Sequence, residues 1–274
     1  MYTINNELKF SGVGLHSGLD STLTLIPTDS EGIFFKTRSG LYPITVANVA
    51  EDNRLTGFKL PDGTMIRTGE HMLAAISGMG VNSLVISLEG EEVPILDGSA
   101  YEFASAINET GLKCISETDK KSFITNDITV SDLKHDKIVS VLPSEDLIVT
   151  YVIDYPGTPI GTQKVTFNIT PEIFLEKISK ARTFCLTYEL DYLKQNGLAK
   201  GGSLDNAMVF SETGLINESG FRIPLECVTH KVIDILGDLT LLGSVPIGHY
   251  VSVCGGHAMH AKLVDKIRRS IYPM

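Results

Sequence analysis

Apolar residues in the first half of the chain fall into short runs separated by turn residues. Runs of strand length occur at 21–26, where leucines alternate with polar residues, at 32–35 and at 82–88. Residues 71–77 are instead rich in helix formers and end before a glycine, and residues 100–108 have a similar composition. The pattern predicts strands, then a helix, a further strand and a second helix.

The same plan begins again after the polar stretch 116–122, which has the composition of a linker. Strand-length apolar runs follow at 124–130, 138–142 and 147–153. Because the sequence shows no short-period repeat, any duplication is one of topology. We predict an α+β fold with two similar domains, 1–118 and 119–274, each a small mixed sheet with helices packed against it.

Helices dominate the remainder of the second half. Thr170 and Pro171 open a helix in the expected way, with a hydroxyl residue at the N-cap and proline at the first helical position. A long helix is predicted from about Val228 to Leu242. A strand at 250–254 then leads through two glycines into a C-terminal helix that begins at His257.

Composition and charge narrow the class of protein. With 43% hydrophobic and 20% charged residues, the chain has the composition of a packed globular protein. Its formal net charge of −10 repels polyanions, so we expect no nucleic-acid partner. No apolar run reaches the roughly 18 to 20 residues of a membrane span, and no basic segment leads into an apolar one at the start. We therefore expect no stable membrane insertion and a cytoplasmic location.

The four cysteines are far apart in the sequence, at positions 114, 185, 227 and 254. No C-x-x-C pair occurs, so the cysteines indicate neither a zinc knuckle nor a redox dithiol. We expect them to be reduced thiols. The candidate chemistry lies instead with histidines and carboxylates.

The long predicted helix carries His230 and Asp234 four residues apart, so the two side chains project from one face and can hold one metal ion between them. Asp238 follows at the same spacing. Taken alone, such a pair is more often a surface pair or a capping arrangement. Here the rest of the helix is apolar apart from Lys231, so the polar stripe indicates contact with something ionic.

Glu70 and His71 lie where a predicted turn passes into a helix, so the two side chains diverge. The simpler interpretation is a carboxylate favoured at a helix start, beside an incidental histidine. Together, however, His71, His230 and Asp234 make a set of two histidines and one carboxylate. Three protein ligands with an open position are typical of a catalytic zinc, and Glu70 would be its general base.

Two glycine-rich segments are less specific. Gly255 and Gly256 present His257 at a helix start, where a histidine is as often a cap or a core residue. The segment 12–18 resembles a phosphate-binding loop at first sight. It is not a G-x-G-x-x-G that opens a helix, and no G-K-S or G-K-T occurs in the chain, so we interpret it as a turn between strands.

Seven longer motifs occur in order along the chain: SGVGLHSG at 11–18, GEHMLAAISGMG at 69–80, VPILDGSA at 93–100, KARTF at 180–184, GLAKGGSLD at 197–205, HKVIDILGDL at 230–239 and GGHAMHAKL at 255–263. With these motifs the chain resembles the zinc-dependent UDP-3-O-acyl-N-acetylglucosamine deacetylases of Gram-negative lipid A synthesis. The resemblance covers nearly the whole chain and implies two α+β domains that face each other across the active site.

The resemblance implies a role for each of several residues. The family's zinc ligands fall on His71, His230 and Asp234, and its general base falls on Glu70. A histidine thought to be cationic falls on His257. The remaining implied assignments are Asp238 as the aspartate that orients this histidine, Thr183 as the hydroxyl that helps hold the oxyanion, Lys231 near the sugar and phosphate, and Phe184, Gly202 and Ser203 as substrate contacts.

The segment around 183–205 corresponds to the insertion that forms the acyl-chain passage of the family. Two positions depart from the family pattern. Where many members carry a basic residue available to the substrate diphosphate, this chain has Cys254. The family often has a cysteine near the metal in the first domain, and the corresponding segment 53–56 has none. The first departure bears on nucleotide affinity and the second on inhibition by excess metal.

The resemblance implies zinc-dependent hydrolysis of the N-acetyl group of UDP-3-O-acyl-N-acetylglucosamine, which releases acetate, in lipid A biosynthesis. The expected partner is this small UDP-linked acylated sugar, the expected cofactor is Zn²⁺, and the expected state is a monomer. One alternative, motivated by Cys254, is a paralogous zinc deacetylase that acts on another N-acetylated sugar. The other is a catalytically silent binding scaffold of the same fold.

Overall fold

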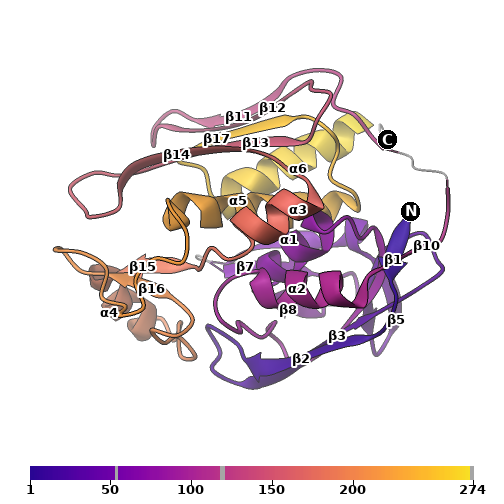
Figure 1. The fold of residues 1–274 in the computed structure, drawn as a ribbon, viewed down its shortest axis with the longest axis horizontal. Helices are drawn as coiled ribbons and strands as arrows, with labels where there is room; N and C mark the ends of the chain where they lie inside the picture. Colours follow the sequence, from indigo (N-terminus) through magenta and orange to yellow (C-terminus); the bar gives the residue numbers. More distant parts are fainter. Residues whose placement is uncertain (53–54, 118–120, 272–274) are drawn as a thin grey trace.

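The computed structural model describes residues 1–52, 55–117 and 121–271. Figure 1 shows two sheets with helices between them, so the chain is layered as sheet, helices, helices and sheet. An arm that carries α4, β15 and β16 projects from this framework at the left of the view. Within the described ranges, no helix is both long and apolar enough to cross a membrane.

In the described part of the first half there are ten strands, two α-helices and one 3₁₀ turn, η1. Their bounds are β1 Tyr2–Ile4, β2 Leu8–Val13, β3 Asp20–Ile26, β4 Gly32–Thr37, β5 Gly40–Pro43, η1 Ile44–Val46, β6 Asn48–Asp52, β7 Leu55–Lys59, β8 Met65–Arg67, α1 Glu70–Gly78, β9 Ser83–Glu89, α2 Tyr101–Thr110 and β10 Leu112–Cys114.

The second half adds the remaining elements, among them the π-helical turn η2 and the 3₁₀ turn η3. Their bounds are β11 Ile128–Asp132, β12 Lys137–Leu142, β13 Ile148–Tyr155, β14 Gly161–Asn168, α3 Pro171–Ile173, η2 Phe174–Ile178, β15 Phe184–Leu186, α4 Thr187–Gln195, β16 Met208–Phe210, α5 Glu226–Leu239, η3 Thr240–Leu242, β17 His249–Val253 and α6 His257–Ile271.

The two large sheets have the same topology. One has the strand order β2-β3-β9-β4-β5 and the other β11-β12-β17-β13-β14. In each, the central strand pairs in parallel with one neighbour, β4 or β13, and antiparallel with the other. The predicted α+β class with two similar sheets is confirmed. The predicted boundary at 118/119 lies outside the described residues and stays a prediction.

Helices α1 and α5 lie between the two sheets, and this position explains their composition. Eight of the nine residues of α1 and thirteen of the fourteen of α5 are buried, because each helix packs against its own sheet and against the other helix. Gly237 permits the close approach, since a Cβ there would lie 2.2 Å from the carbonyl oxygen of Glu70. Polar residues on these two helices are therefore held in a dry interior.

Most predicted elements are present with shifted ends. The helix predicted at 71–77 is α1, and the one predicted at 228–242 is α5, which ends at Leu239 and continues as a 3₁₀ turn. Thr170 caps α3 as predicted, because its hydroxyl accepts the Ile173 N–H at 3.2 Å. The strand predicted at 124–130 is wrong at its start, because β11 begins only at Ile128.

The small sheet β6-β7-β8, strand β14 and helix α4 were not predicted. Strand β14 lies at the edge of its sheet, and its residues are half-buried or exposed, so it lacks the apolar run that marks a buried strand. Helix α4 has no buried residue. Both elements owe their place to neighbouring structure and not to an apolar pattern of their own.

Candidate active site

A cavity of about 720 Å³ opens between the two halves and the projecting arm. At one end it is lined by ionisable side chains of α1 and α5 and by His257 at the start of α6. At the other end the arm lines it mainly with apolar side chains, which are Leu190, Leu193, Leu204, Ile216 and Val209, together with Thr187, Glu189 and Lys194 of α4. A ligand that fills the cavity would therefore have a polar end and an apolar end.

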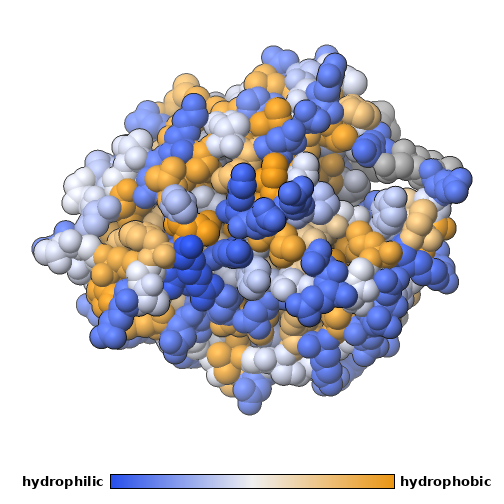
Figure 2. Space-filling model, in the orientation of Figure 1, coloured by the Kyte–Doolittle hydropathy of each residue, from blue (hydrophilic) through white to orange (hydrophobic). Residues whose placement is uncertain are grey.

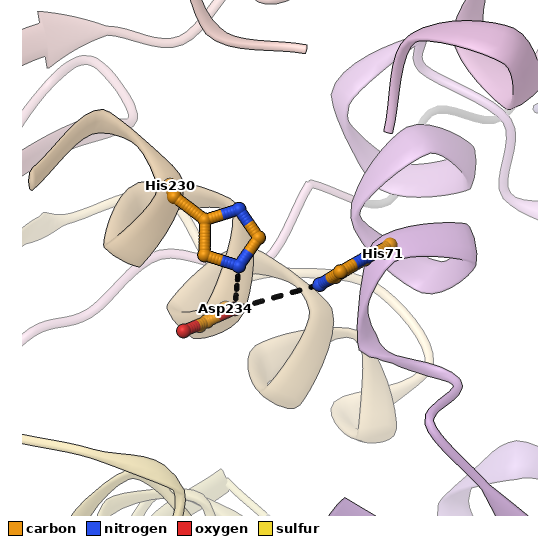
Figure 3. Close-up of side chains that lie close together, drawn as sticks. All are labelled: His71, His230 and Asp234. Atoms are coloured by element: carbon orange, nitrogen blue, oxygen red, sulfur yellow. Dashed lines mark ion pairs between the residues drawn. The ribbon is translucent and has the colours of Figure 1, made fainter. Parts of the chain in front are cut away.

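The three predicted metal ligands meet where α1 and α5 face each other. His71 comes from the first turn of α1, and His230 and Asp234 come from one face of α5 (Figure 3). Asp234 Oδ1 lies 3.3 Å from His230 Nε2 and 4.0 Å from His71 Nε2. The three ligand atoms all lie within 4.8 Å of one another. Atoms bound tetrahedrally at about 2.0–2.1 Å from one zinc ion lie roughly 3.3 Å apart, so the set fits a metal ion.

The protonation states of these residues also suit a cation. Burial lowers the pKa of His71 to about 3 and also lowers the pKa of His230, so both rings are neutral at pH 7. His230 Nδ1 donates to the carbonyl oxygen of Ala181 at 3.0 Å, which leaves the lone pair of Nε2 facing Asp234. Two imidazole lone pairs and a carboxylate thus converge, an arrangement that a positive charge between them stabilises.

Asp234 stays ionised despite its burial. Burial alone would raise its pKa, but the Lys231 ammonium, 2.8 Å away, and the neighbouring histidines lower the pKa well below its ordinary value. The same contact raises the pKa of Lys231 against the opposing effect of burial. Lys231 is the one residue of α5 that is not buried, and its Nζ lies 5.2 Å from the centre of the Phe184 ring. A fixed ammonium is thus presented to the cavity.

Glu70 lies beside the cluster, with Oε1 4.0 Å from His71 Nε2. Its other carboxylate oxygen is buried and has no hydrogen-bond partner among the described residues. Burial raises the pKa of Glu70 to about 7, and the positive charge of His257 opposes that rise. A carboxyl group with a pKa near neutrality and a free oxygen is suited to accept a proton from water.

His257 and Asp238 form the predicted pair. His257 Nδ1 donates to Asp238 Oδ2 at 2.8 Å, and His257 Nε2 lies 3.9 Å from Asp234 Oδ2. Burial alone would lower the pKa of His257, but Asp238 raises it to about 9. The histidine is therefore a cation at neutral pH, and it faces the metal cluster.

Asp238 has a second donor that the sequence analysis did not single out. His260 Nδ1 donates to the same Oδ2 atom at 2.7 Å, and its Nε2 lies 3.2 Å from the hydroxyl of Tyr151. Because burial raises the pKa of Tyr151, its hydroxyl stays protonated and donates to His260. The spacing of three residues between the two histidines on one helix is the signal that would have found it.

Thr183 and Phe184 line the cavity beside the cluster, as do Gly202 and Ser203. The backbone of Thr183 is held on both sides, since its N–H donates to Gly98 at 2.8 Å and its carbonyl accepts from Met208 at 2.8 Å. The structure thus brings every predicted site residue except Asp238, which acts behind His257, to the wall of one cavity. The segment predicted as an insertion, 183–205, contains β15 and α4, and Leu190 and Leu193 of α4 face the cavity.

The arm remains apolar on its outer side as well. Figure 2 shows hydrophobic residues at the surface where α4 and its neighbouring loops lie, at the left of the view. Leu204 and Ile216 line the cavity and are still 47% and 43% exposed. The apolar end of the cavity is therefore open toward solvent, whereas the cluster end is buried.

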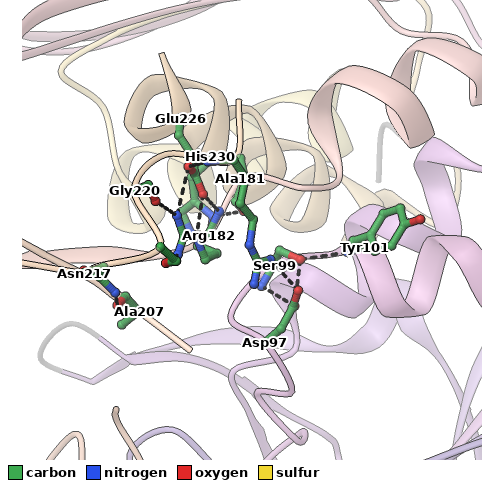
Figure 4. Close-up of polar contacts among 12 residues, drawn as sticks. Asp97, Ser99, Tyr101, Ala181, Arg182, Ala207, Asn217, Gly220, Glu226 and His230 are labelled. Carbon is green, nitrogen blue, oxygen red and sulfur yellow. Dashed lines mark hydrogen bonds and ion pairs between the residues drawn. The ribbon is translucent and has the colours of Figure 1, made fainter. Parts of the chain in front are cut away.

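A buried ion pair behind the cluster was also missed, because nothing in the sequence links its two members. Arg182 Nε donates to Glu226 Oε1 at 2.8 Å, and Arg182 Nη2 donates to Gly220 at 2.7 Å (Figure 4). Arg182 is 1% exposed and Glu226 0%. The pair anchors the start of α5 to the segment around Arg182. In that segment the Ala181 carbonyl accepts from His230, and Thr183 lines the cavity.

Of the two departures from the family pattern, Cys254 is a described residue, whereas the segment 53–56 is described only in part. Cys254 is half-buried and has a left-handed backbone with φ of 49°, held by its N–H, which donates to Val152 at 2.9 Å. Its side chain is not part of the cavity wall formed by the described residues. The segment 53–56 includes residues 53 and 54, which lie outside the described residues.

Comparisons with known proteins find relatives of one family along nearly the whole chain. The family model described as UDP-3-O-acyl N-acetylglycosamine deacetylase matches residues 1–269. A protein of Syntrophotalea carbinolica named UDP-3-O-acyl-N-acetylglucosamine deacetylase is 40% identical over 270 residues, which cover 97% of this chain and 86% of that protein. Proteins of the same name from Saccharophagus degradans and Helicobacter pylori are 38% and 35% identical, and each match covers 97% of this chain and 90% of the relative.

Proposed function

The chain belongs to the UDP-3-O-acyl-N-acetylglucosamine deacetylase family, whose hydrolysis of UDP-3-O-acyl-N-acetylglucosamine is a step of lipid A biosynthesis, and we propose that it performs this hydrolysis at the cavity between α1 and α5. The observation that carries the proposal is the convergence of two neutral histidines, one ionised aspartate and a buried carboxylate, that of Glu70, whose Oε2 has no hydrogen-bond partner among the described residues. This set lies at the polar end of a cavity whose other end is apolar.

We assign the metal to His71, His230 and Asp234, and zinc is the ion that two imidazoles and one carboxylate suit best. Such an ion, when bound, supplies Lewis-acid chemistry that makes water a better nucleophile near neutral pH and polarises a carbonyl group. The protein fixes the ligands in advance, because the Ala181 carbonyl orients His230 and the Lys231 ammonium orients Asp234. This orientation limits the reorganisation that binding requires.

Glu70 acts as the general base in this proposal. It accepts a proton from water as the water oxygen bonds to the acetamide carbonyl carbon. The hydroxyl of Thr183 and the protonated ring of His257 then donate to the oxyanion that develops on the carbonyl oxygen. When the C–N bond breaks, the proton returns to the amine from Glu70 or His257, and the products are acetate and a free amino sugar.

The two ends of the cavity match the two ends of the substrate. The side chains of the arm offer an apolar channel for the acyl chain, and Lys231 offers a positive charge to the sugar and phosphate region. Phe184, Gly202 and Ser203 are assigned as further substrate contacts at the junction. All proposed ligands come from one chain, so we propose that the enzyme acts as a monomer, and we place it in the cytoplasm.

Mass spectrometry of acetate release tests the proposal. Purified protein is incubated with UDP-3-O-acyl-N-acetylglucosamine, before and after treatment with a chelator, and then with zinc added back. We expect release that the chelator abolishes and zinc restores. UDP-N-acetylglucosamine, which lacks the acyl chain, is the matched control and should react far more slowly. Equal rates on both compounds would contradict the assignment of the apolar arm, and chelator-resistant release would contradict the metal assignment.

A further inference from the structure

The turn at 14–18, between β2 and β3, has a structural role that the proposed chemistry does not use. Gly18 N–H donates to the Gly14 carbonyl at 2.9 Å, and Gly14 N–H donates to Leu19 at 3.0 Å, so the turn predicted from the sequence is present. Leu15 and His16, at its tip, line the cavity. The turn belongs to the first half of the chain but faces the arm of the second half.

Glu92 holds this turn from behind. The residue is 1% exposed, and its carboxylate accepts the backbone N–H of His16 at 2.9 Å on Oε1 and the N–H of Ser17 at 2.8 Å on Oε2. The hydroxyl of Thr68 donates to Oε1 at 2.7 Å. These donors, and the Ser17 hydroxyl that also bonds the carboxylate, are all neutral. Burial alone would raise the pKa of Glu92, but the hydrogen bonds, led by that from the His16 N–H, lower it, so the carboxylate is charged at neutral pH.

The other side of the turn holds the arm. Gly201 N–H donates to the Leu15 carbonyl at 3.0 Å, and Lys200 N–H donates to the His16 carbonyl at 3.3 Å. Ala199 N–H donates to His16 Nδ1 at 3.4 Å. These three consecutive amides lie just beyond α4, in the segment that leads into Gly202 and Ser203.

Glycine makes this contact possible. A Cβ at Gly201 would lie 2.3 Å from the Gly14 carbonyl oxygen, a distance that forces the two backbones apart. A Cβ at Gly14 would lie 2.3 Å from Glu92 Oε2. The carboxylate, the turn and the arm are therefore packed as three layers with no room for a side chain between them.

We propose that Glu92 is a positioning residue for acyl-chain selectivity: by holding the turn 14–18 against residues 199–201, it fixes the wall of the apolar arm of the cavity. This inference rests on the proposed function, because it takes the arm as the site of the acyl chain. Glu92 does not line the cavity, so its effect reaches the substrate only through the turn.

The change Glu92→Gln tests this role with little change in shape. An amide has one acceptor oxygen and one NH₂ group, so in either orientation at least one backbone N–H of the turn faces a donor. A buried donor that loses its acceptor weakens the contact strongly. The turn then no longer offers its carbonyls to residues 199–201, while Glu70 and the metal ligands are untouched.

The measurement is kcat/KM on two UDP-3-O-acyl-N-acetylglucosamine substrates, one with a long and one with a short acyl chain. For Glu92→Gln we expect the long-chain value to fall about tenfold through KM, and the short-chain value by less than about twofold, with zinc content unchanged. Glu91→Gln is the matched control, because Glu91 is exposed and its side chain pairs with Arg67 at 2.9 Å. The control should leave the ratio of the two values unchanged.

An equal fall on both substrates, or no change in the ratio, would overturn the proposal. If Glu92→Gln fails to fold, Gly201→Ala parts the turn from the arm from the other side and should give the same loss of selectivity. Hydrogen exchange of the wild-type protein gives a further check, since amides 199–201 should be protected, and rapid exchange there would overturn the proposal too. A wild-type protein that releases no acetate from either substrate would instead contradict the proposed function.

Discussion

The two halves of the molecule share one framework but contribute differently to the site. In each half, the helix that precedes the central strand of the sheet lies at the interface, α1 before β9 and α5 before β17. The nine residues of α1 supply Glu70 and His71 in its first turn, whereas the fourteen of α5 supply His230, Asp234 and Asp238 along one face. The same topology thus gives the proposed base and one proposed ligand in one half, and two proposed ligands with a proposed positioning aspartate in the other.

The segments that precede these two helices differ more. Between β5 and α1 lies the small sheet β6-β7-β8, and between β14 and α5 lies the arm with β15, α4 and β16. Among the residues that the structure describes in these two segments, those of the second alone contribute to the apolar part of the cavity. The duplicated framework therefore carries the proposed metal ligands and general base, whereas the segment before α5, which is not duplicated, carries Thr183 and the apolar wall of the proposed selectivity.

Removing one ligand from each half is the most severe test of this division. We expect His71→Ala and His230→Ala each to abolish stoichiometric zinc binding and to lower kcat by at least about 10³-fold, because two ligands cannot hold a catalytic zinc. Zinc content by atomic emission and acetate release are the measurements. His135→Ala is the control, since His135 is exposed and pairs only with Asp132 among the described residues. Full activity and full zinc content in His230→Ala would show that the ligand set is wrong.

The next test distinguishes the proposed base on α1, Glu70, from the proposed metal ligand beside it, His71. Glu70→Gln keeps the shape of the side chain but removes its ability to accept a proton, so kcat should fall by about 10²–10⁴-fold. Zinc should stay bound, because Glu70 is not one of the three ligands. Loss of zinc together with activity would instead place Glu70 among the ligands.

Local spacing explains what the sequence could predict of this site. His230, Asp234 and Asp238 lie on one helix at intervals of four, so their common face follows from helix geometry. Glu70 and His71 were recognised at a helix start, and the resemblance to a family joined the two sets. Without it, nothing in the sequence places α1 against α5, since that contact depends on the layering of two sheets and on the glycine at 237.

Contacts over long sequence separations were not predictable in this way. Glu226 and Arg182 are buried charges that are far apart in the sequence, so only the folded chain shows that they pair. The hydrogen bonds from residues 16 and 17 to Glu92 likewise join segments that the hydrophobic pattern of the sequence does not connect. Strand β14 and helix α4 lack buried apolar periodicity because each lies at an edge of the molecule. The apolar pattern predicted the central strands of the two sheets and the helices between them; it missed β14 and α4, and also short strands such as β16, whose three residues are buried but too few to show a period.

The pH dependence of kcat/KM distinguishes the acid and base contributed by the two halves. Glu70 must be ionised, so activity rises as pH increases through its pKa, which burial raises to about 7 and a bound cation lowers again. His257 must be protonated, so activity falls as pH passes its pKa of about 9. His257→Gln should lower the rate by about 10²-fold and remove the alkaline limb. An unchanged profile in this variant would remove His257 from the mechanism.

Helix α6 carries two histidines, His257 and His260, whereas α2, its counterpart in the first half, carries none. Removing the second of these histidines should have a smaller effect on kcat. His260→Leu removes one of the two donors to Asp238 and should lower kcat about tenfold with little change in KM. His260→Asn supplies an N–H donor at nearly the same place and should restore most of kcat. Equal losses in both variants would mean that His260 contributes packing alone.

The smallest expected effect concerns Cys254, at the place where related enzymes can present a positive charge to the substrate diphosphate. The chain has a net charge of −10, which already opposes an anionic substrate, so we expect Lys231 to supply more of the positive charge that the diphosphate needs. Cys254 is half-buried just before α6 and not part of the described cavity wall, so a lysine there would reach the phosphates from the rim. A partly exposed charge pair contributes up to about 1 kcal/mol, so Cys254→Lys should raise kcat/KM by no more than about fivefold, through KM.

The dependence of kcat/KM on ionic strength shows whether this gain is electrostatic. An exposed pair is screened, so the advantage of Cys254→Lys should shrink as ionic strength rises, while kcat stays the same. Cys254→Met, which lengthens the side chain without adding charge, is the matched control and should show no gain at any salt concentration. Because Cys254 already has a left-handed backbone with φ of 49°, both variants meet the same backbone cost, and the difference between them isolates the charge. A gain that persists at high salt, or that methionine reproduces, would show that the side chain acts by contact, and the diphosphate would then be bound by another basic group.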